Sequence, residues 1–326
     1  MKFKIAFAHF SILFSKISSN PDNLCHLNFE SRKNFYRQRT RLVQDRCLIS
    51  SAVNKSTKTT LKDILQSSNN VSLPLIVDAT HKIIYCEIPK ASSTNWKRTL
   101  IKLSNPEKYR DVKNIMAIRN PRKSQHYDLK YLSDFSLEEQ LKMLNSQNYF
   151  KFTFVRHPLD RLLSAYKDKA AEDFRGKHGE KVFKFYSQSG QMDKFLKYDI
   201  ESFHKFLQFV LAQGNNHDHN NSNLNQKIGI KERHWTPYSK LCHFCSIEYD
   251  FIGKLESVVQ DAAYLLEFWK KDGRTSDKID GKLMYPAVSS MTDRKLVEKY
   301  FEGIDKETLS EIYSLFADDF ELFDYH

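Results

Sequence analysis

The chain has 326 residues, 40% hydrophobic and 13% aromatic, so it can bury a substantial core and wholesale disorder is excluded. Glycine is scarce, with 9 residues against 24 Phe, which excludes collagen-like and glycine-rich architectures. The formal net charge of +11 indicates an anionic partner, and the alternative is a solvated surface without a function. Because the sequence has no zinc-finger or RNA-binding signature, an acidic polysaccharide or a polyphosphorylated cofactor fits as well as nucleic acid.

The N-terminus has the charge and hydropathy pattern of a targeting segment. Lys2 and Lys4 precede an apolar stretch from Ile5 to Phe14 that is interrupted by His9. This stretch is too short to span a bilayer, which needs about 20 apolar residues. A signal-like segment, a truncated membrane anchor and a leader without function remain open. Sequons that agree with secretory passage begin at Asn54, Asn70 and Asn220.

Residues 1–70 are polar and basic, and we interpret them as a partly disordered leader or stem outside the core. A helix is predicted within this stem around Arg32 to Cys47.

The first predicted strand, Ile83 to Ile88, runs into a short loop and then a helix from about Thr94 to Leu103. Such a junction presents unpaired backbone N–H groups and the positive end of the helix dipole to an anion. Lys90 adds a full charge there, and hydroxyl donors come from Ser92, Ser93 and Thr94. The loop therefore predicts a phosphate or sulfate site.

A second strand–loop–helix unit follows. The run Ser136–Glu139 is a capping box that opens a helix ending near Asn145. A strand is predicted over Phe150–Val155; it stops at His157-Pro158, and a helix continues from near Asp160 to about Lys169. Two such units within one stretch imply a parallel sheet with crossover helices.

This second unit also contains a candidate anion site. Arg156 closes the strand, and Ser164 falls about one helical turn after Arg161. An arginine at a strand end and a serine on the next helix can converge on one phosphate, which the arginine binds bidentately. The alternative is that Arg156 and Arg161 pair with carboxylates such as Asp160 and Asp168.

Further along, a helix is predicted over Ile200–Ala212, followed by a solvated loop over residues 214–225. Near the C-terminus a single apolar helical face is predicted to cover the core. Its members are Leu309, Ile312, Tyr313, Phe316 and Phe320.

The five cysteines include one CxxC pair, Cys242 and Cys245. No second pair completes a zinc set, and the CxxC precedes a strand-like run, Tyr249–Ile252, whereas a redox centre favours a strand-to-helix junction. A local disulfide between the two is predicted for an oxidising compartment, with a plain buried pair as the alternative.

The two anion sites together are more specific than either alone. One basic loop for a reacting terminal group and a second for a separate phosphate describe the donor 3′-phosphoadenosine 5′-phosphosulfate (PAPS). A nucleotide-dependent kinase fits less well, because the chain has no GxxxxGK[ST] motif, no glycine-rich loop and no acidic residue that closes a strand to hold magnesium.

These motifs resemble those of a known family. The stretch from Pro89-Lys90 to Asn95-Trp96-Lys97 is similar to the 5′-phosphosulfate motif of Golgi carbohydrate sulfotransferases, and Val155–Tyr166 to their 3′-phosphate motif. The resemblance is greatest to the branch with chondroitin and dermatan 4-O-sulfotransferases, the HNK-1 sulfotransferase and the GalNAc 4-O-sulfotransferases. It extends from about residue 80 to the end through His234-Trp235, Cys242-x-x-Cys245, Tyr249–Glu256 and Asp319–Tyr325.

The resemblance implies an α/β fold with a P-loop-like parallel sheet flanked by helices, forming a catalytic domain over residues 71–326. It also implies PAPS as the donor, with the cofactor-binding residues Pro89, Lys90, Ala91, Ser92, Ser93, Thr94, Asn95, Trp96, Arg156 and Ser164. Two features depart from the family pattern: His157 replaces a glutamate that usually follows the motif arginine, and the single-pass anchor is not recognisable.

The reaction implied is in-line sulfuryl transfer to a sugar hydroxyl without a metal. Lys90 would stabilise charge on the leaving phosphate, and a histidine, which titrates near neutrality, would accept the hydroxyl proton. His126 is our choice of base; His234 is the second candidate and could instead bind the acceptor. Arg119, Arg122 and Lys123 are predicted to contact an acidic glycan, with a solvated charge cluster as the alternative.

We therefore expect a glycan sulfotransferase of the Golgi lumen, built as a type II membrane protein whose N-terminus associates with the membrane. Its expected partner is an acidic glycan or glycosaminoglycan rather than nucleic acid. A chondroitin-like GalNAc 4-OH is favoured over a glucuronic acid 3-OH as the acceptor. The main alternative is a non-catalytic glycan-binding protein that retains a degenerate sulfotransferase fold.

Overall fold

The computed structural model describes residues 24, 26–54, 60–66, 73–104, 106–108, 130–171, 199–214, 233–275 and 293–326. The chain divides into two compact units, residues 1–155 with 242–289, and residues 156–241 with 290–326. Each unit has its own hydrophobic core. None of the helices in the described part of the chain is long and apolar enough to cross a membrane.

The first unit is built on a five-stranded sheet with the order β3-β1-β2-β4-β5. Strands β2, β4 and β5 are parallel, whereas β1 is antiparallel to both β2 and β3. The predicted α/β fold with a parallel core is thus confirmed, and the structure adds an antiparallel edge that the sequence reading missed. The strands are β1 (Leu75–Asp78), β2 (Ile83–Cys86), β3 (Lys130–Tyr131), β4 (Phe150–Val155) and β5 (Phe251–Lys254).

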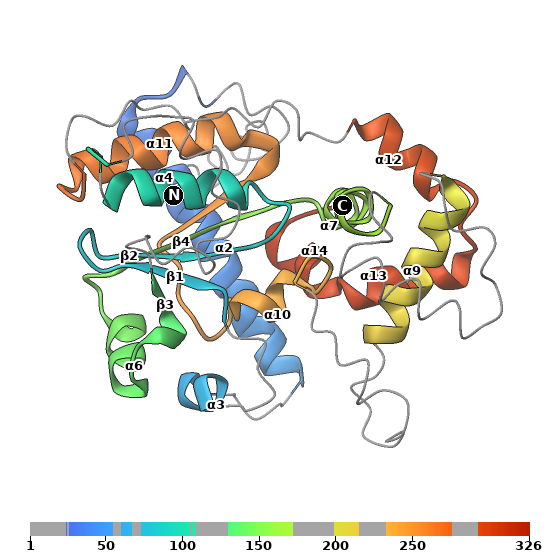
Figure 1. The fold of residues 1–326 in the computed structure, drawn as a ribbon, viewed down its shortest axis with the longest axis horizontal. Coiled ribbons are helices and arrows are strands. Elements are labelled where there is room, and N and C mark those ends of the chain that lie inside the picture. Colours follow the sequence, from blue (N-terminus) through green and yellow to red (C-terminus); the bar gives the residue numbers. More distant parts are fainter. Residues whose placement is uncertain are drawn as a thin grey trace, which may run out of the picture. The chain divides into compact units, whose positions relative to one another are not determined.

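Helices cover the sheet of this unit. Helices α4 (Ser93–Ser104) and α11 (Val258–Lys271) lie side by side along it (Figure 1), and they meet where the ring centroids of Trp96 and Trp269 are 6.0 Å apart. Helices α3 and α6 lie on the opposite side in this view. The remaining elements here are α3 (Leu61–Gln66), α6 (Leu137–Asn145, opened by the predicted capping box) and the 3₁₀ turns η3 (Leu132–Asp134) and η7 (Leu255–Ser257).

Helix α2 (Phe29–Asn54) corrects part of the sequence interpretation. We expected the helix within residues 1–70 to lie outside the core, but Phe35 and Tyr36 are buried in it. The Tyr36 ring stacks 4.3 Å from that of Tyr264 and lies 4.9 Å from that of Phe251. The high density of polar residues along α2 hid these few apolar positions, because they form a narrow stripe on one side of the helix.

The exposed edge of β5 is closed by a buried polar network from α2 and α11. Arg39 forms an ion pair of 2.5 Å with Asp261 and donates to the carbonyl of Ile252. Asp261 also accepts from the backbone N–H of Lys254, at 2.7 Å, and from the Tyr36 hydroxyl, at 2.8 Å. The backbone carbonyl of Ile252 and the N–H of Lys254 on this edge are thereby hydrogen-bonded within the unit, so they are not available to pair with another strand.

The disulfides also differ from the prediction. Cys242 is bonded to Cys86 and Cys245 to Cys47, so no local Cys242–Cys245 disulfide forms. A CxxC spacing suggested a local partner, but the fold brings β2 and α2, both distant in sequence, to this segment. The two bridges join residues 156 and 198 positions apart.

The described elements of the second unit are all helical. They are α7 (Pro158–Ala165), the π-helical turn η4 (Tyr166–Ala171), α9 (Ile200–Gly214), α10 (Tyr238–Cys242, whose last residue belongs to the first unit), α12 (Arg294–Phe301), α13 (Lys306–Leu315) and α14 (Ala317–Phe323). The predicted C-terminal apolar face is broken, since the chain divides into α13 and α14 at Phe316. Ile312 and Phe316 are buried as expected, whereas Tyr313 is 42% exposed.

Candidate active site

The loop between β2 and α4 has an unusual backbone. Lys90 and Ser92 have φ angles of 70° and 63°, a left-handed conformation that non-glycine residues rarely adopt. The loop turns tightly, with the N–H of Ala91 bonded to the carbonyl of Ile88 at 3.3 Å. Strain of this kind persists only where the surrounding structure enforces it, and it is common at binding sites.

The residues of this loop alternate between core and surface. Pro89, Ala91 and Trp96 are buried, whereas Lys90 is half-buried and Thr94 is exposed. The Trp96 ring packs against the rings of the sheet residues Tyr85, Phe152 and Phe154, and this contact attaches α4 to the sheet. The surface of the loop is left to Lys90, Ser92, Thr94 and Asn95, and Asn95 Nδ2 donates to Ser92 Oγ at 3.3 Å.

Helix α4 begins at Ser93, directly after the turn, and the N–H of Trp96 makes its first helical bond, to the carbonyl of Ser92. The N–H groups before Trp96 have no helical carbonyl to bond. They point out of the helix start, where the dipole is positive. Together with the Lys90 ammonium and the hydroxyls, this set of donors suits a sulfuryl or phosphoryl group.

Glu87 holds the base of the Lys90 loop, a role that was not predicted from the sequence. Its carboxylate accepts from Lys97 Nζ at 2.6 Å and from the Tyr131 hydroxyl at 3.2 Å. Glu87 thereby joins the end of β2 to the first turns of α4 and to β3. Glu87 and Lys97 stand on either side of a loop, so no helical or strand spacing rule pairs them in the sequence.

The second predicted anion site follows β4. Strands β2 and β4 are adjacent and parallel, with Cys86 opposite Thr153, so both strands end at the same edge of the sheet. Open α/β sheets bind ligands at this carboxyl edge. Arg156 comes directly after β4 and is 2% exposed, and Ser164 is half-buried on α7. Both belong to the second unit, whereas the Lys90 loop belongs to the first.

Arg161 holds a different part of the second unit in place. Its guanidinium is fully buried and donates to the carbonyls of Arg233, at 2.7 Å, and Thr236, at 2.8 Å. It also lies 5.6 Å from the centroid of the Tyr238 ring. Burial lowers the pKa of Arg161 to about 10, which still leaves it charged at neutral pH. The turn that contains His234 is therefore fixed on either side of that residue.

Asp319 completes this arrangement from α14. Its carboxylate accepts from the N–H groups of Tyr238, at 2.9 Å, and Ser239, at 2.8 Å, and so caps α10. Trp235 donates from Nε1 to Gln213 at 2.9 Å. His234 is half-buried in a turn held by long-range bonds, which is the kind of support that a reacting or substrate-binding side chain needs.

His157, the residue that departs from the family pattern, is packed against the C-terminal segment. Its ring meets those of Phe320 and Tyr325 at centroid distances of 5.5 and 5.3 Å. Its Nε2 lies 3.2 Å from the carbonyl oxygen of His326, and its Nδ1 lies 3.5 Å from Asp160. These contacts account for a histidine at this position through packing.

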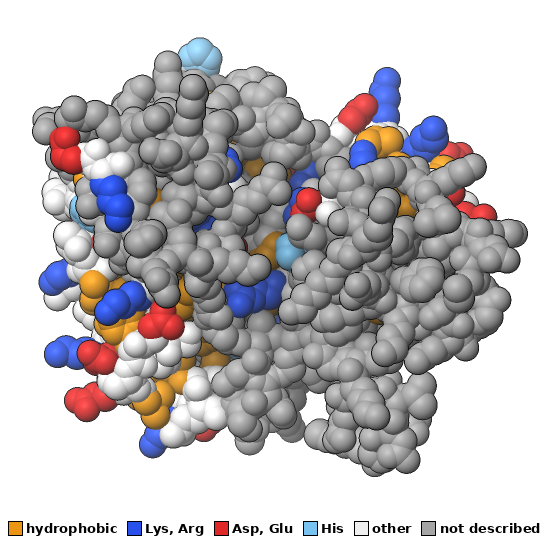
Figure 2. All heavy atoms as spheres, in the orientation of Figure 1, with side chains coloured by type: hydrophobic (Ala, Val, Ile, Leu, Met, Phe, Trp, Pro, Cys, Tyr) orange, Lys and Arg blue, Asp and Glu red, His pale blue; other side chains and the backbone are white. Residues whose placement is uncertain are grey.

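Several predicted site residues lie outside the described part of the chain, namely His126, Arg119, Arg122 and Lys123. On the face drawn in Figure 2, described Lys and Arg side chains lie among Asp and Glu side chains in several places.

The fold places the Lys90 loop and the start of α4 directly after β2, at the carboxyl edge of the parallel strands. A family model described as "Sulfotransferase family" matches residues 73–326, so the chain belongs to the sulfotransferase family and is an enzyme of that family. The resemblance deduced from the motifs is thus confirmed.

Individual relatives are named carbohydrate sulfotransferases. Carbohydrate sulfotransferase 11 of Mus musculus is 29% identical over 311 residues, covering 93% of this chain and 79% of the relative. Carbohydrate sulfotransferase 10 of Rattus norvegicus is 30% identical over 318 residues, covering 96% of this chain and 82% of the relative. Carbohydrate sulfotransferase 14 of Danio rerio is 35% identical over 195 residues, covering 59% of this chain and 47% of the relative. No solved structure matches the chain.

Proposed function

We propose that this enzyme transfers the sulfuryl group of PAPS to a hydroxyl of an acidic glycan, with a chondroitin-like GalNAc 4-OH as the favoured acceptor. The observation that carries the proposal is the strained Lys90 loop at the start of α4. The names of the relatives support a carbohydrate acceptor. The basic composition of the chain favours an acidic one.

The residues present fit the donor molecule. The N–H groups at the start of α4, with Lys90, Ser92 and Asn95, form a donor set for the 5′-phosphosulfate. Arg156 and Ser164 supply a guanidinium and a hydroxyl for the 3′-phosphate. Bound PAPS supplies an activated sulfuryl group; positioning and charge stabilisation are left to the protein.

In the proposed reaction, the acceptor oxygen forms a bond to sulfur while the bond from sulfur to the phosphate oxygen breaks. The Lys90 ammonium stabilises the negative charge that grows on that bridging oxygen. The proton of the acceptor hydroxyl passes to a histidine, for which we propose His126. The supported turn around His234 keeps that residue as the second candidate, either as the base or as a ligand of the acceptor.

Lys90 provides the first test. We expect Lys90→Ala to lower kcat about 10²- to 10³-fold, the size of effect seen when one donor to a developing anion is removed. Lys102→Ala is the matched control, because Lys102 lies in the last turn of the same helix, away from the loop. Transfer is measured with labelled PAPS and a panel of desulfated glycosaminoglycans, which also identifies the acceptor.

Binding of the product 3′-phosphoadenosine 5′-phosphate, measured by isothermal titration, provides the second part of the test. Absence of binding, or binding untouched by Lys90→Ala and Arg156→Ala, would overturn the proposal. Binding of the nucleotide and of glycan without any transfer would instead support the non-catalytic alternative.

The proton acceptor needs a separate measurement. If His126 is the base, His126→Ala abolishes the acidic limb of the pH–rate profile while nucleotide affinity stays unchanged. Full turnover in this variant, with loss in His234→Ala, would transfer the role to His234.

We also propose that the enzyme works in the secretory pathway, as a type II membrane protein of the Golgi lumen. The two disulfides support an oxidising compartment.

A further inference from the structure

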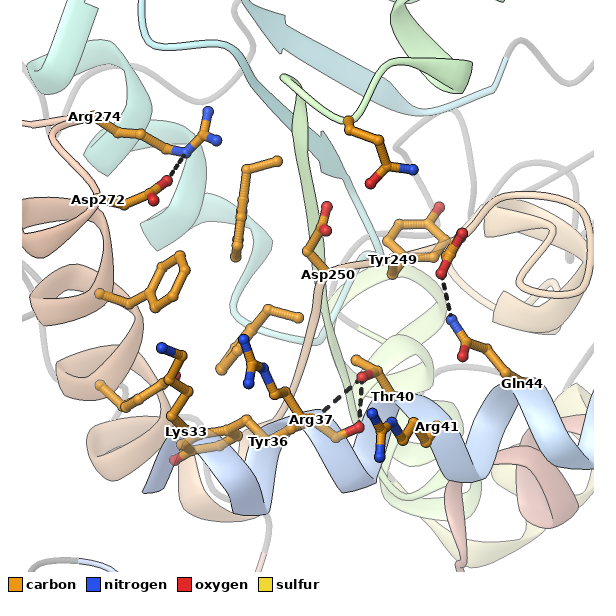
Figure 3. A pocket seen from close by; sticks show the side chains of 16 residues that line it. Lys33, Tyr36, Arg37, Thr40, Arg41, Gln44, Tyr249, Asp250, Asp272 and Arg274 are labelled. Carbon is orange, nitrogen blue, oxygen red and sulfur yellow. Dashed lines mark hydrogen bonds and ion pairs between the residues drawn. The ribbon is translucent and has the colours of Figure 1, made fainter. Parts of the chain in front are cut away.

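A cavity of about 610 Å³ lies in the first unit, beside the N-terminal half of α2. Its other walls come from the starts of β4 and β5 and from the C-terminal end of α11 (Figure 3). This volume is within the range of ligand-binding clefts, about 300–1,000 Å³.

The cavity lies away from the donor site. Phe150, which lines it, is the first residue of β4 and pairs with Ile83, the first residue of β2. The Lys90 loop follows the opposite end of β2, about 13 Å further along the strand. The sheet therefore separates a cleft at its amino edge from the donor loop at its carboxyl edge.

Helix α2 presents a row of cations to this cleft. Lys33, Arg37 and Arg41 follow one another at four-residue intervals, one per helical turn, and all three line the cavity. Arg37 and Arg41 are exposed, and no carboxylate in the described part of the chain forms an ion pair with either. In Figure 3 these side chains rise from α2 on one side of the cavity, with Asp250 across from them.

The carboxylates of the cleft already have donors. Glu248 accepts from Gln44 at 2.9 Å, and Asp250 accepts from the backbone N–H of Lys151 at 2.7 Å. Asp272 accepts from Arg274 at 2.7 Å. Each carboxylate nevertheless has further acceptor capacity, since an ionised carboxylate offers about four lone-pair sites.

The cleft also has aromatic walls. The rings that line it are those of Tyr36, Phe150, Tyr249, Phe251, Tyr264 and Phe268. Aromatic faces beside polar groups suit a ligand that has apolar C–H surfaces as well as hydroxyls.

We propose that this cleft is a second binding site for an anionic oligosaccharide, which holds a segment of the acceptor chain remote from the reacting sugar. Arg37 and Arg41 bind carboxylate or sulfate groups of the chain, and the acidic side chains accept from its hydroxyls. The proposal rests on the proposed function for the identity of the chain as acceptor, whereas binding itself does not depend on catalysis.

The mixed charge of the cleft decides between an anionic glycan and a nucleic acid. A phosphate backbone is negative at every repeat and offers few donors, so Glu248, Asp250 and Asp272 would repel it. A glycan with uronic acid or sulfate groups offers both anions for the arginines and hydroxyl donors for the carboxylates. The cleft therefore fits the glycan.

The test is the double variant Arg37→Gln/Arg41→Gln. Isothermal titration with unsulfated chondroitin polymer should show affinity about 5- to 10-fold weaker than wild type, and a shallower dependence on salt. The affinity for 3′-phosphoadenosine 5′-phosphate should stay unchanged. Lys295→Gln/Lys299→Gln is the matched control, because these exposed lysines also lie one turn apart, on α12, and removing them takes away the same charge.

Kinetics give a second readout. The variant should raise KM for the polymer and leave kcat/KM unchanged for a short acceptor oligosaccharide that fills only the reacting site. Polymer affinity equal to wild type, an equal loss in the Lys295/Lys299 control, or double-stranded DNA displacing the polymer in an Arg37- and Arg41-dependent way would overturn the proposal.

The outcomes separate this inference from the proposed function. Arginine-dependent polymer binding without sulfuryl transfer would support the cleft and refute the reaction. Transfer to the polymer with no effect of the double variant would support the reaction and refute the cleft.

Discussion

Asp319 is a fully buried carboxylate whose main bonds go to two backbone N–H groups at the start of α10. Burial raises its pKa to about 6 from an ordinary value of 3.8, although the bonds to Ser239 and the charge of Arg161 act in the opposite direction. Burying the ionised carboxylate therefore costs free energy of folding. The carboxylate supports the turn that contains His234.

The raised pKa predicts a pH dependence of stability. A group whose pKa is higher in the folded state stabilises the fold fully below its unfolded pKa, and this contribution is lost as the pH rises through the folded pKa. Relative to Asp319→Asn, wild type should therefore lose up to about 3 kcal/mol of unfolding free energy between about pH 4 and about pH 6. Urea unfolding at a series of pH values measures this.

Asp318→Asn is the control, since Asp318 is the exposed neighbour on the same helix. Parallel curves for wild type and Asp319→Asn would contradict the prediction. The Asn side chain in Asp319→Asn can still accept from one of the two N–H groups of α10. The variant therefore tests the loss of the charge more than the loss of the hydrogen bonds to α10.

At the residue scale, local patterns in the sequence were enough to predict the Lys90 loop, because a strand end, a proline and a helix start are adjacent in the chain. They were not enough for Glu87, Arg161 or Asp319. The partners of Arg161 lie 72 and 75 residues away, and the N–H groups bound by Asp319 lie 81 and 80 residues away. Only the fold brings such groups together.

Helix α2 is attached to α11 by an ion pair, between Arg39 and Asp261, that lies within an apolar contact. Asp261 is fully buried, and Arg39 provides its compensating cation. Removing one member of a buried pair leaves the other charge without a partner, which costs about 3–5 kcal/mol.

Arg39→Met should therefore lower the unfolding free energy by about 3–5 kcal/mol in urea titration. Arg37→Met, two residues earlier and exposed, should change it by no more than about 0.5 kcal/mol. Arg39→Lys keeps a cation and should fall between the two. Equal small effects of Arg39→Met and Arg37→Met would show that α2 contributes little to the fold.

Element prediction succeeded where the period of hydrophobic residues was complete. The strand predicted over Phe150–Val155 is β4, and its six residues are all buried. Strand β3, by contrast, is only two residues long, too short to show a period, and β1 was missed although it has four residues, as many as β2. They exist because β2 offers β1 an edge to pair with, which is a property of the sheet.

For the whole molecule, the disulfides determine which distant segments are covalently joined. Bridges that close long loops restrict the unfolded chain most, and a loop of about 100 residues gives about 4.7 kcal/mol in the chain-entropy model. The separations of 156 and 198 residues differ little on this logarithmic scale.

We therefore expect Cys86→Ser/Cys242→Ser and Cys47→Ser/Cys245→Ser to lose similar amounts of unfolding free energy, each about 2–5 kcal/mol. Denaturant titration of each double variant measures the loss, and peptide mapping without reductant tests the pairing directly. A peptide linking Cys242 to Cys245 would contradict it.

The Cys86–Cys242 bridge has a topological consequence. Residues 87–241 form a closed covalent ring whose two ends meet at the end of β2. Most of the second unit, residues 156–241, lies within that ring. A single peptide-bond cut anywhere inside it would leave the protein in one covalent piece, and new termini placed there would not release either end from the sheet. Change in the length or sequence of the ring is thereby uncoupled from the attachment of its ends, which favours diversification of this part of the enzyme.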